Sequence, residues 1–113
     1  MIELYHNPRC RKSREALAYL TASSREFKTI EYLKTPLSAE KLKDIIDKLG
    51  IDPLELIRRE ESIWKINYKN QGLSDQDLIQ LMIDEPRLMQ RPIVIYGDKG
   101  VVARPVEALD NLL

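Results

Sequence analysis

The first third of the chain carries the pattern that most restricts its fold. Residues 2–5 form a short β-prone segment, which an Asn-Pro turn follows. Apolar residues then recur on one helical face between about residues 10 and 21, and residues 27–33 form a second β-prone segment. Two strands joined through a helix pair in parallel, so this opening predicts a βαβ unit and an α/β fold.

The middle of the chain, over approximately residues 36–89, has a mostly helical pattern. Apolar residues at helical spacing follow Ser38, a favourable N-cap, and Gly50 ends that helix. We expect a short helix over residues 52–59, because Asp-Pro begins it, and a further helix over residues 74–85, which starts with Ser-Asp and stops before a proline.

The last part of the chain returns to β-structure. Residues 92–96 form a buried strand, residues 97–100 a hairpin turn and residues 101–103 the return strand. Pro105 suits the first position of a terminal helix whose inward face is apolar.

This order of elements resembles a thioredoxin-like domain with a helical insertion, residues 36–89, between its second and third strands. The chain has 113 residues and is 43% hydrophobic, which is enough for one core and too little for two. We therefore expect a single domain over residues 1–113.

Charge and apolar patterning exclude several classes of protein. Eighteen basic and eighteen acidic side chains cancel, which removes the broad positive field of nucleic-acid binders and membrane-surface proteins. No apolar run approaches the roughly 20 residues of a membrane span, and the charged start of the chain is unlike a secretory signal. A single cysteine cannot form an internal disulfide, so we expect a reducing compartment, the cytoplasm. We also expect the protein to be a monomer.

Cys10, the only cysteine, is the strongest candidate for chemistry. It stands at the predicted start of the first helix, where backbone N–H groups carry partial positive charge. Arg9, Arg11, Lys12 and Arg14 add full charges, so the thiolate is favoured and the residue is interpreted as a nucleophile. The ordinary alternative is a buried, inert thiol.

Three other roles of Cys10 are disfavoured by its neighbours. Ser13 occupies the second position of a CxxC pair, so a partner thiol must come from outside the chain. A low-molecular-weight tyrosine phosphatase loop needs an arginine where this chain has Ala16. One cysteine and one histidine supply too few ligands for structural zinc, so no metal site is expected.

Arg58, Arg91 and Arg104 each stand at the border of an apolar segment. Several guanidinium forks together bind a tetrahedral oxyanion through multiple hydrogen bonds. Taken singly, each is more often a solvated or ion-paired surface arginine, and periodicity does not show that the three converge.

Polar residues near Cys10 are candidates for supporting roles. His6 either poises the thiolate or bonds to the loop backbone. Asn7 is expected to fix the turn through its side chain, and Ser13 to donate to the Cys10 sulfur; local capping is the alternative for both. Trp64 and Tyr68 are interpreted as packing residues of the insertion.

Four short motifs occur in order along essentially the whole chain: His6-Asn7-Pro8-Arg9-Cys10 with Ser13-Arg14, Leu56-Ile57-Arg58, Arg91-Pro92-Ile93-Val94, and Arg104-Pro105. Together they resemble the glutathione/glutaredoxin-coupled arsenate reductase family. The chain is more similar to the short arsenate-reductase-like branch, because Arg11-Lys12 replaces the small uncharged residues of the best-known reductases and the sequence ends at Leu113 without their longer tail.

The resemblance implies a function and a set of roles. The cysteine matching Cys10 is the nucleophile, and the arginines matching Arg58, Arg91 and Arg104 bind arsenate. The histidine matching His6 assists the thiolate. Glutathione is the implied co-substrate and glutaredoxin the implied partner, with no tightly bound cofactor.

Two motif residues have supporting roles in this interpretation, Arg14 and Pro92. Thioredoxin-like folds place a cis-proline beside the active cysteine, which makes Arg91-Pro92 the candidate for a cis peptide bond.

Two other functions stay open from the sequence. The fold family includes bacterial transcription regulators that bind RNA polymerase, although these commonly use a CxxC switch that Ser13 breaks. A thiol-dependent reductase that acts on another oxyanion or on protein thiols is the second alternative.

Overall fold

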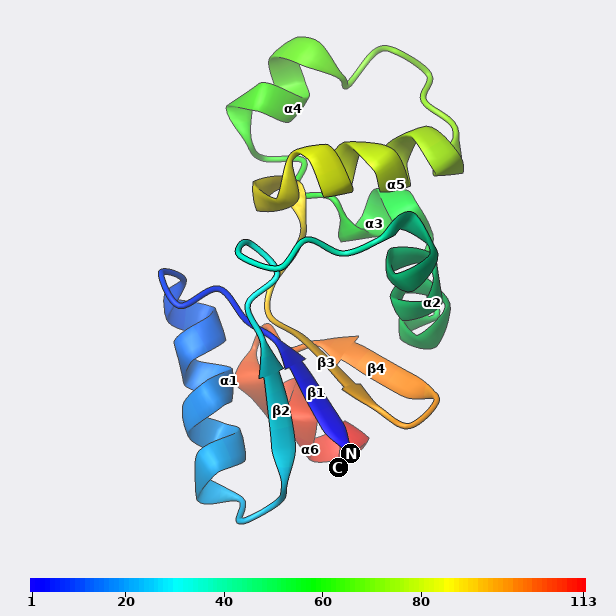
Figure 1. The fold of residues 1–113 in the computed structure, drawn as a ribbon. Coiled ribbons are helices and arrows are strands. Elements are labelled where there is room, and N and C mark those ends of the chain that lie inside the picture. Colours follow the sequence, from blue (N-terminus) through cyan, green and yellow to red (C-terminus); the bar gives the residue numbers. More distant parts are fainter.

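The chain forms a four-stranded sheet with helices on both faces and a helical layer above one end (Figure 1). The computed structural model describes all residues from 1 to 113. The strands are β1 (Ile2–Tyr5), β2 (Phe27–Ile30), β3 (Ile93–Tyr96) and β4 (Lys99–Val102). Their order in the sheet is β2-β1-β3-β4, with β1 parallel to β2, antiparallel to β3, and β3 antiparallel to β4. The expected thioredoxin-like α/β fold is confirmed.

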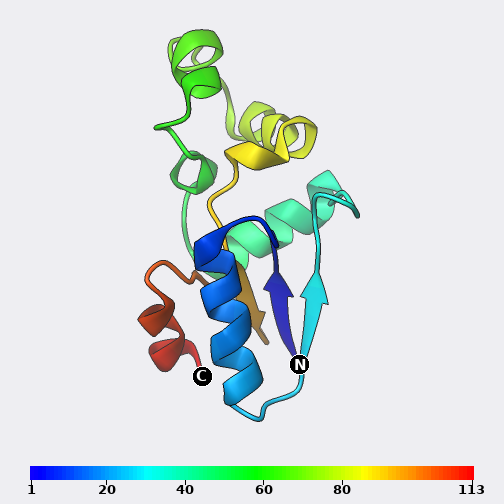
Figure 2. The ribbon, with the colours of Figure 1, turned by 90° about the vertical axis from the view of Figure 1, so that its left-hand side faces the viewer.

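Two apolar clusters lie on opposite faces of the sheet, because side chains alternate along each strand. Leu4 joins the cluster beneath α1 (Arg11–Ala22) and the C-terminal α6 (Leu109–Leu112), and Figure 2 shows these helices next to each other. Tyr5, the next residue, joins the larger cluster on the other face, which continues into the helical layer.

The helical layer lies between β2 and β3 in the sequence. It is preceded by α2 (Ala39–Leu49), which packs against β3 and β4 and covers the second face of the sheet. The members of the layer are α3 (Pro53–Leu56), α4 (Ser62–Asn67), α5 (Asp75–Asp84) and the short 3-10 helix η1 (Pro86–Leu88). None of these or the other helices has the length and apolar character that a bilayer span requires.

Local signals set the ends of the two longer helices as predicted. The Ser38 side chain accepts a hydrogen bond from the Lys41 backbone at the start of α2, and Gly50 ends that helix at φ 68°. At the start of α5, Ser74 and Asp77 form a reciprocal capping box.

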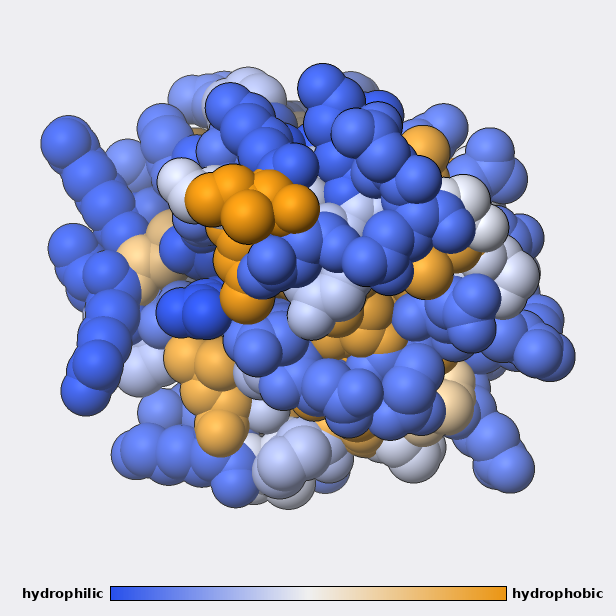
Figure 3. All heavy atoms as spheres, turned by 90° about the horizontal axis from the view of Figure 1, so that it is seen from above, coloured by the Kyte–Doolittle hydropathy of each residue, from blue (hydrophilic) through white to orange (hydrophobic).

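The helical end of the molecule carries a mostly hydrophilic surface. Seen from above, its hydrophobic atoms lie in separate small areas (Figure 3). The most exposed large hydrophobic residue, Ile66 in α4, has 80% of its surface accessible. This view therefore shows no broad apolar face of the kind that marks a docking site.

Three element boundaries differ from those predicted. The strand β2 ends at Ile30 instead of residue 33, because a turn begins at Glu31. The Glu31 carbonyl accepts hydrogen bonds from the backbone N–H groups of Lys34 and Thr35. The helix α3 ends at Leu56, because Ile57 enters a β-bridge. The hairpin turn is shorter than expected, since Lys99 already pairs with the strand opposite.

The C-terminal helix also departs from the prediction. It is divided into a 3-10 helix, η2 (Val106–Ala108), and α6. Leu109 is fully buried at the junction, so the apolar face predicted for this segment still packs against the sheet.

Candidate active site

Cys10 lies at the junction between the β1–α1 loop and α1. It is the N-cap of α1, with extended backbone angles and a half-buried side chain. Its carbonyl accepts the first hydrogen bond of the helix from Arg14 at 3.0 Å, and its own N–H donates to Asn7 at 3.0 Å. The predicted position of the sulfur at a helix start is therefore confirmed.

A buried hydrogen-bond network fixes the loop before Cys10. The Asn7 side chain accepts from the Arg9 backbone at 3.0 Å, which is the turn-fixing role predicted for it. The Ser13 hydroxyl accepts from the Asn7 backbone at 3.0 Å and lies 2.6 Å from Nδ1 of His6. The backbone N–H of His6 donates to Ile30 on β2, so the network joins α1, the loop and the sheet.

The donation predicted from Ser13 to the Cys10 sulfur comes from its backbone N–H. The Ser13 hydroxyl bonds to His6 and Asn7. The serine lies one turn into α1, where its side chain faces back to the loop while its amide is one of the free N–H groups at the helix start.

His6 contacts Ser13 through its ring and is 5% exposed. Burial lowers the pKa of His6 below its ordinary value, and the charge of Arg14 lowers it further, while Glu31 opposes this. The imidazole is therefore neutral at neutral pH, and it reaches Cys10 only through Ser13.

The environment of Cys10 favours the thiolate. Burial raises the pKa of the thiol, but the backbone amides of Ser13 and Lys12 and the guanidinium of Arg91 lower it by more. The net result is a pKa below the ordinary value of a cysteine.

The full charge beside the sulfur belongs to Arg91 and not to the neighbours of Cys10 in sequence. The Arg11 and Lys12 side chains pair with Glu15 at 3.5 and 3.7 Å. The Arg14 guanidinium donates to the carbonyl of Pro8 at 3.0 Å. The expectation that the flanking cations stabilise the thiolate is corrected accordingly.

Arg91 reaches Cys10 through the sheet. The register pairs Tyr5 at the end of β1 with Ile93 at the start of β3, so the residue before Pro92 lies at the edge where the Cys10 loop begins. The Arg91–Pro92 peptide bond is cis, as the resemblance implies. One guanidinium nitrogen of Arg91 donates to the carbonyl of Arg87 at 3.1 Å.

Arg104 lies next to Arg91. The backbone N–H of Ala103 donates to the carbonyl of Pro92 at 2.9 Å, which holds the end of β4 against the start of β3. The Arg104 guanidinium is 3.4 Å from the carbonyl of Arg91, and the Arg104–Pro105 bond is also cis. Arg104 is exposed to solvent at this edge.

Arg58 follows a bridge between two distant segments. Ile57 pairs antiparallel with Met89, and the Arg58 N–H donates to Leu88 at 2.7 Å. This pairing sets Arg58 beside the segment that leads into Arg91. Its side chain is 16% exposed.

Two carboxylates hold the Arg58 guanidinium. Nη1 lies 2.9 Å from Glu61, and Nε lies 3.4 Å from Glu60 without the alignment of a hydrogen bond.

Tyr32 is a residue of this region that the sequence did not single out. It falls within the predicted second strand, residues 27–33, but it lies in the turn after β2 and is 2% exposed. Burial raises its pKa, and the charges of Arg91, Cys10 and Arg58 also act on its hydroxyl. Its position just beyond β2 could have predicted its place near Cys10, because β1 and β2 are parallel and the segments that follow them begin at the same edge of the sheet.

Three buried polar atoms at this edge have no hydrogen-bond partner in the protein: Oη of Tyr32, Nε of Arg58 and Nε of Arg91. Buried donors without partners are rare and costly. All three can donate to an oxygen anion, so the arrangement suits binding of a small multi-oxygen anion near a thiolate. The structure contains no group of three or more His, Cys, Asp or Glu side chains placed to hold a metal ion.

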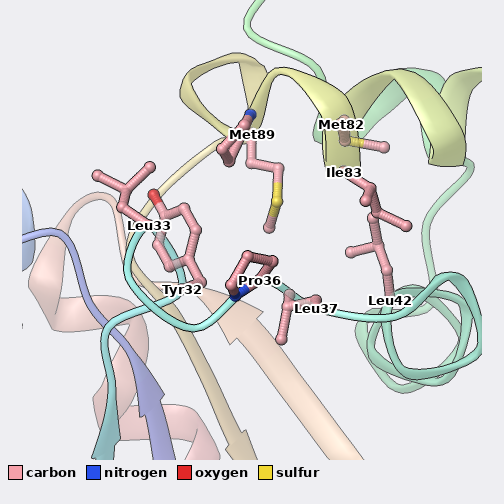
Figure 4. Close-up of a pocket in the computed structure, with 9 residues that line it drawn as sticks. Tyr32, Leu33, Pro36, Leu37, Leu42, Met82, Ile83 and Met89 are labelled. Atoms are coloured by element: carbon pink, nitrogen blue, oxygen red, sulfur yellow. The ribbon is translucent and has the colours of Figure 1, made fainter.

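A small apolar cavity of about 40 Å³ lies beside Tyr32, lined also by Pro36, Leu37 and Met89 (Figure 4). The Tyr32 hydroxyl lies at the end of this cavity away from Met82 (Figure 4). The cavity itself does not include the cysteine or the three arginines.

Comparisons with known proteins agree over nearly the whole chain. The family model described as the ArsC family matches residues 5–112. An arsenate reductase of Neisseria meningitidis is 36% identical over 114 residues, covering 99% of this chain and 97% of its own. The Escherichia coli K12 protein YfgD, described as uncharacterised, is 43% identical over 108 residues, covering 94% of this chain and 91% of its own.

The fold gives the same answer as the sequence comparison. The structure of an arsenate reductase from Vibrio cholerae superposes with a TM-score of 0.92 at 36% identity, covering 99% of this chain and 97% of that one. Because the family model spans both the Cys10 loop and all three arginine segments, the resemblance of the four motifs is confirmed, and the chain belongs to the ArsC family.

Proposed function

We propose that the protein reduces arsenate to arsenite with Cys10 as the nucleophile. The observation that carries this proposal is the pairing of a half-buried thiol of lowered pKa with the Arg91 guanidinium. Arg58 lies beside the segment that leads into Arg91, and the Arg104 guanidinium lies 3.4 Å from the carbonyl of Arg91. Arsenate is the proposed substrate because several of the named relatives are arsenate reductases.

In the first step, the Cys10 thiolate attacks arsenic of the bound arsenate. A sulfur–arsenic bond forms and an arsenic–oxygen bond breaks, with the oxygen leaving as water after protonation. Arsenic remains pentavalent in this adduct, so the step is covalent catalysis without electron transfer. This step requires the thiolate, and the lowered pKa of Cys10 increases the fraction of the residue in that form.

In the second step, a glutathione thiolate attacks the Cys10 sulfur of the adduct. A disulfide bond forms and the sulfur–arsenic bond breaks, with its electron pair left on arsenic. Reduction of pentavalent to trivalent arsenic takes up two electrons, and the joining of two thiols in a disulfide supplies them. Arsenate and two thiols thus give arsenite, one disulfide and water. Because Cys10 is the only cysteine, glutaredoxin is proposed to remove the glutathione from outside.

The arginines neutralise the anion and the charge that develops on it. Arg91 serves both the thiolate and arsenate, while Arg58 and Arg104 are proposed to bind arsenate oxygens. His6 is proposed to act as a positioning residue, because its contact with Ser13 holds the helix start whose amides approach the sulfur.

The proposed partners imply a place and a form of action. Dependence on glutathione requires a reducing compartment, and we propose the cytoplasm. The protein is proposed to act as a monomer that meets glutaredoxin at the exposed rim of the Cys10 loop, where Pro8, Arg9 and Arg11 are accessible.

The test is a coupled assay with arsenate, glutathione and glutaredoxin, in which arsenite is measured. The wild-type protein is expected to turn over, and Cys10→Ser to be inactive while its circular dichroism is unchanged. Arsenite formation by Cys10→Ser would contradict the role of the cysteine. Wild-type turnover of glutathionylated peptides without arsenite formation, or capture of RNA polymerase without any turnover, would contradict the proposed substrate.

A further inference from the structure

The Tyr32 hydroxyl is the one neutral group among the unpartnered donors of the site. The residue is 2% exposed, and its hydroxyl oxygen is buried without a hydrogen-bond partner in the protein. The ring packs against apolar residues, and Figure 4 shows the hydroxyl at the end away from Met82 and Leu42. If this side chain only filled the core, phenylalanine would pack equally well and would not carry the cost of a buried hydroxyl without a hydrogen bond.

The position of Tyr32 follows from the sheet. Tyr5 pairs with Ile30 in the parallel register, so the chain leaves β1 towards Cys10 and leaves β2 towards Tyr32 at the same edge. The backbone N–H of His6 donates to the carbonyl of Ile30, which holds together the segments that follow β1 and β2. The hydroxyl therefore lies in the same polar region as the thiol.

Two guanidinium nitrogens are likewise buried without a hydrogen-bond partner, Nε of Arg58 and Nε of Arg91. Nε of Arg58 lies 3.4 Å from the Glu60 carboxylate, an ion pair without the alignment of a hydrogen bond. Positive charge from Arg91 and Arg58 and negative charge from the Cys10 thiolate act on the hydroxyl. Burial raises the pKa of Tyr32, so the group is protonated and available as a donor at all physiological pH values.

We infer that the Tyr32 hydroxyl donates a hydrogen bond to an oxygen of the anion bound beside Cys10, together with Arg58 and Arg91. Three buried donors with no acceptor among them call for a ligand that brings several acceptor oxygens. A tetrahedral oxyanion does so, and its remaining oxygens stay free for Arg104. This assignment rests on the proposed function and adds a neutral donor to its arginines.

The role has an unusual thermodynamic consequence. In the free protein, the hydroxyl carries the cost of burial without a bond, so its removal is expected to stabilise the fold. In the complex, the same removal deprives one arsenate oxygen of its donor. Tyr32→Phe is therefore expected to raise the melting temperature and weaken anion binding, a combination that a merely structural role would not produce.

The experiment measures how arsenate, and separately inorganic phosphate, protects Cys10 from alkylation by iodoacetamide. We expect Tyr32→Phe to raise the apparent Kd for arsenate about tenfold, which corresponds to about 1.4 kcal/mol. Tyr68→Phe is the matched control, because Tyr68 lies against Trp64 in the helical layer away from the site. The control is expected to keep the wild-type Kd.

The outcomes separate this inference from the proposed function. If arsenate fails to protect the wild-type thiol, the proposed function is wrong. If arsenate protects wild-type and Tyr32→Phe proteins equally, the proposed function stands and the Tyr32 assignment is overturned. A lower melting temperature of Tyr32→Phe would also overturn it, since the hydroxyl would then have a partner in the free protein.

Discussion

The Ser13 hydroxyl lies 2.6 Å from Nδ1 of His6 and ties the first turn of α1 to the end of β1. The same hydroxyl accepts a hydrogen bond from the Asn7 backbone. All three residues are buried, with Ser13 fully so. One side chain thus fixes the loop in which Cys10 begins the helix, and the amide of that same serine approaches the sulfur.

Removal of this hydroxyl is expected to destabilise the protein. Ser13→Ala leaves the His6 ring and the Asn7 amide without partners, at a cost of about 1–3 kcal/mol in the free energy of unfolding. Urea denaturation measures the effect. Ser62→Ala is the control, because Ser62 is exposed at the start of α4. Equal stability of the two variants would contradict the structural role of the network.

His6 is expected to make stability depend on pH. Burial lowers its folded-state pKa below the ordinary value of 6.5, so the unfolded chain takes up the proton first as pH falls. The contribution of the neutral His6 ring to the free energy of unfolding is complete above pH 6.5 and is lost as pH falls through the folded pKa. Unfolding free energies at a series of pH values should fall less steeply for His6→Gln than for wild type. Parallel curves would show that His6 is not buried as a neutral ring.

Arg91, not the basic residues next to Cys10, is expected to control the acidity of the thiol. Arg91→Ala removes the charge beside the sulfur and should raise the pKa of Cys10. Arg11→Ala should leave this pKa unchanged, because the Arg11 side chain is 85% exposed and paired with Glu15. The rate of alkylation as a function of pH measures both. An equal rise in the pKa of Cys10 in the two variants would show that the cations next to Cys10 in sequence also stabilise the thiolate.

The parts of the fold that sequence alone predicted are those fixed by neighbouring residues. Ser38, Gly50 and Ser74 set helix ends through contacts within a few positions, so their patterns are readable. The parallel pairing of β1 with β2 follows from the helix between them. The lone cysteine at a helix start was visible for the same reason.

The parts that sequence did not predict depend on pairings between distant segments. The bridge between Ile57 and Met89 ends α3 early and places Arg58 beside the segment that precedes Arg91. No local sequence pattern predicts this bridge. Tyr32 falls within the predicted second strand, residues 27–33, whereas in the structure it lies beyond Ile30, the end of β2, where the charges of Arg91 and Arg58 act on its hydroxyl. The approach of Arg58 and Arg91 to Tyr32 is thus a property of the tertiary fold.

Arg58 and Arg59 are adjacent in sequence but differ in their surroundings, and this makes a matched pair of variants. Arg58 is 16% exposed and carries a buried Nε without a hydrogen-bond partner, while Arg59 is exposed to solvent. Arg58→Ala is expected to lower kcat for arsenate by about 10² to 10³, the typical effect of removing one donor to a developing anion. Arg59→Ala should leave kcat unchanged.

Stability must be measured alongside activity in this pair. Arg58→Ala also frees Glu60 and Glu61, whose side chains are 62% and 36% exposed, so the loss of these ion pairs is expected to cost no more than about 1 kcal/mol. A folded Arg58→Ala protein with weak activity supports the role of Arg58 in anion binding. If both variants keep wild-type kcat and KM while remaining folded, Arg58 serves only to orient the segment that follows α3, and the oxyanion would be held by Arg91 and Arg104 without it.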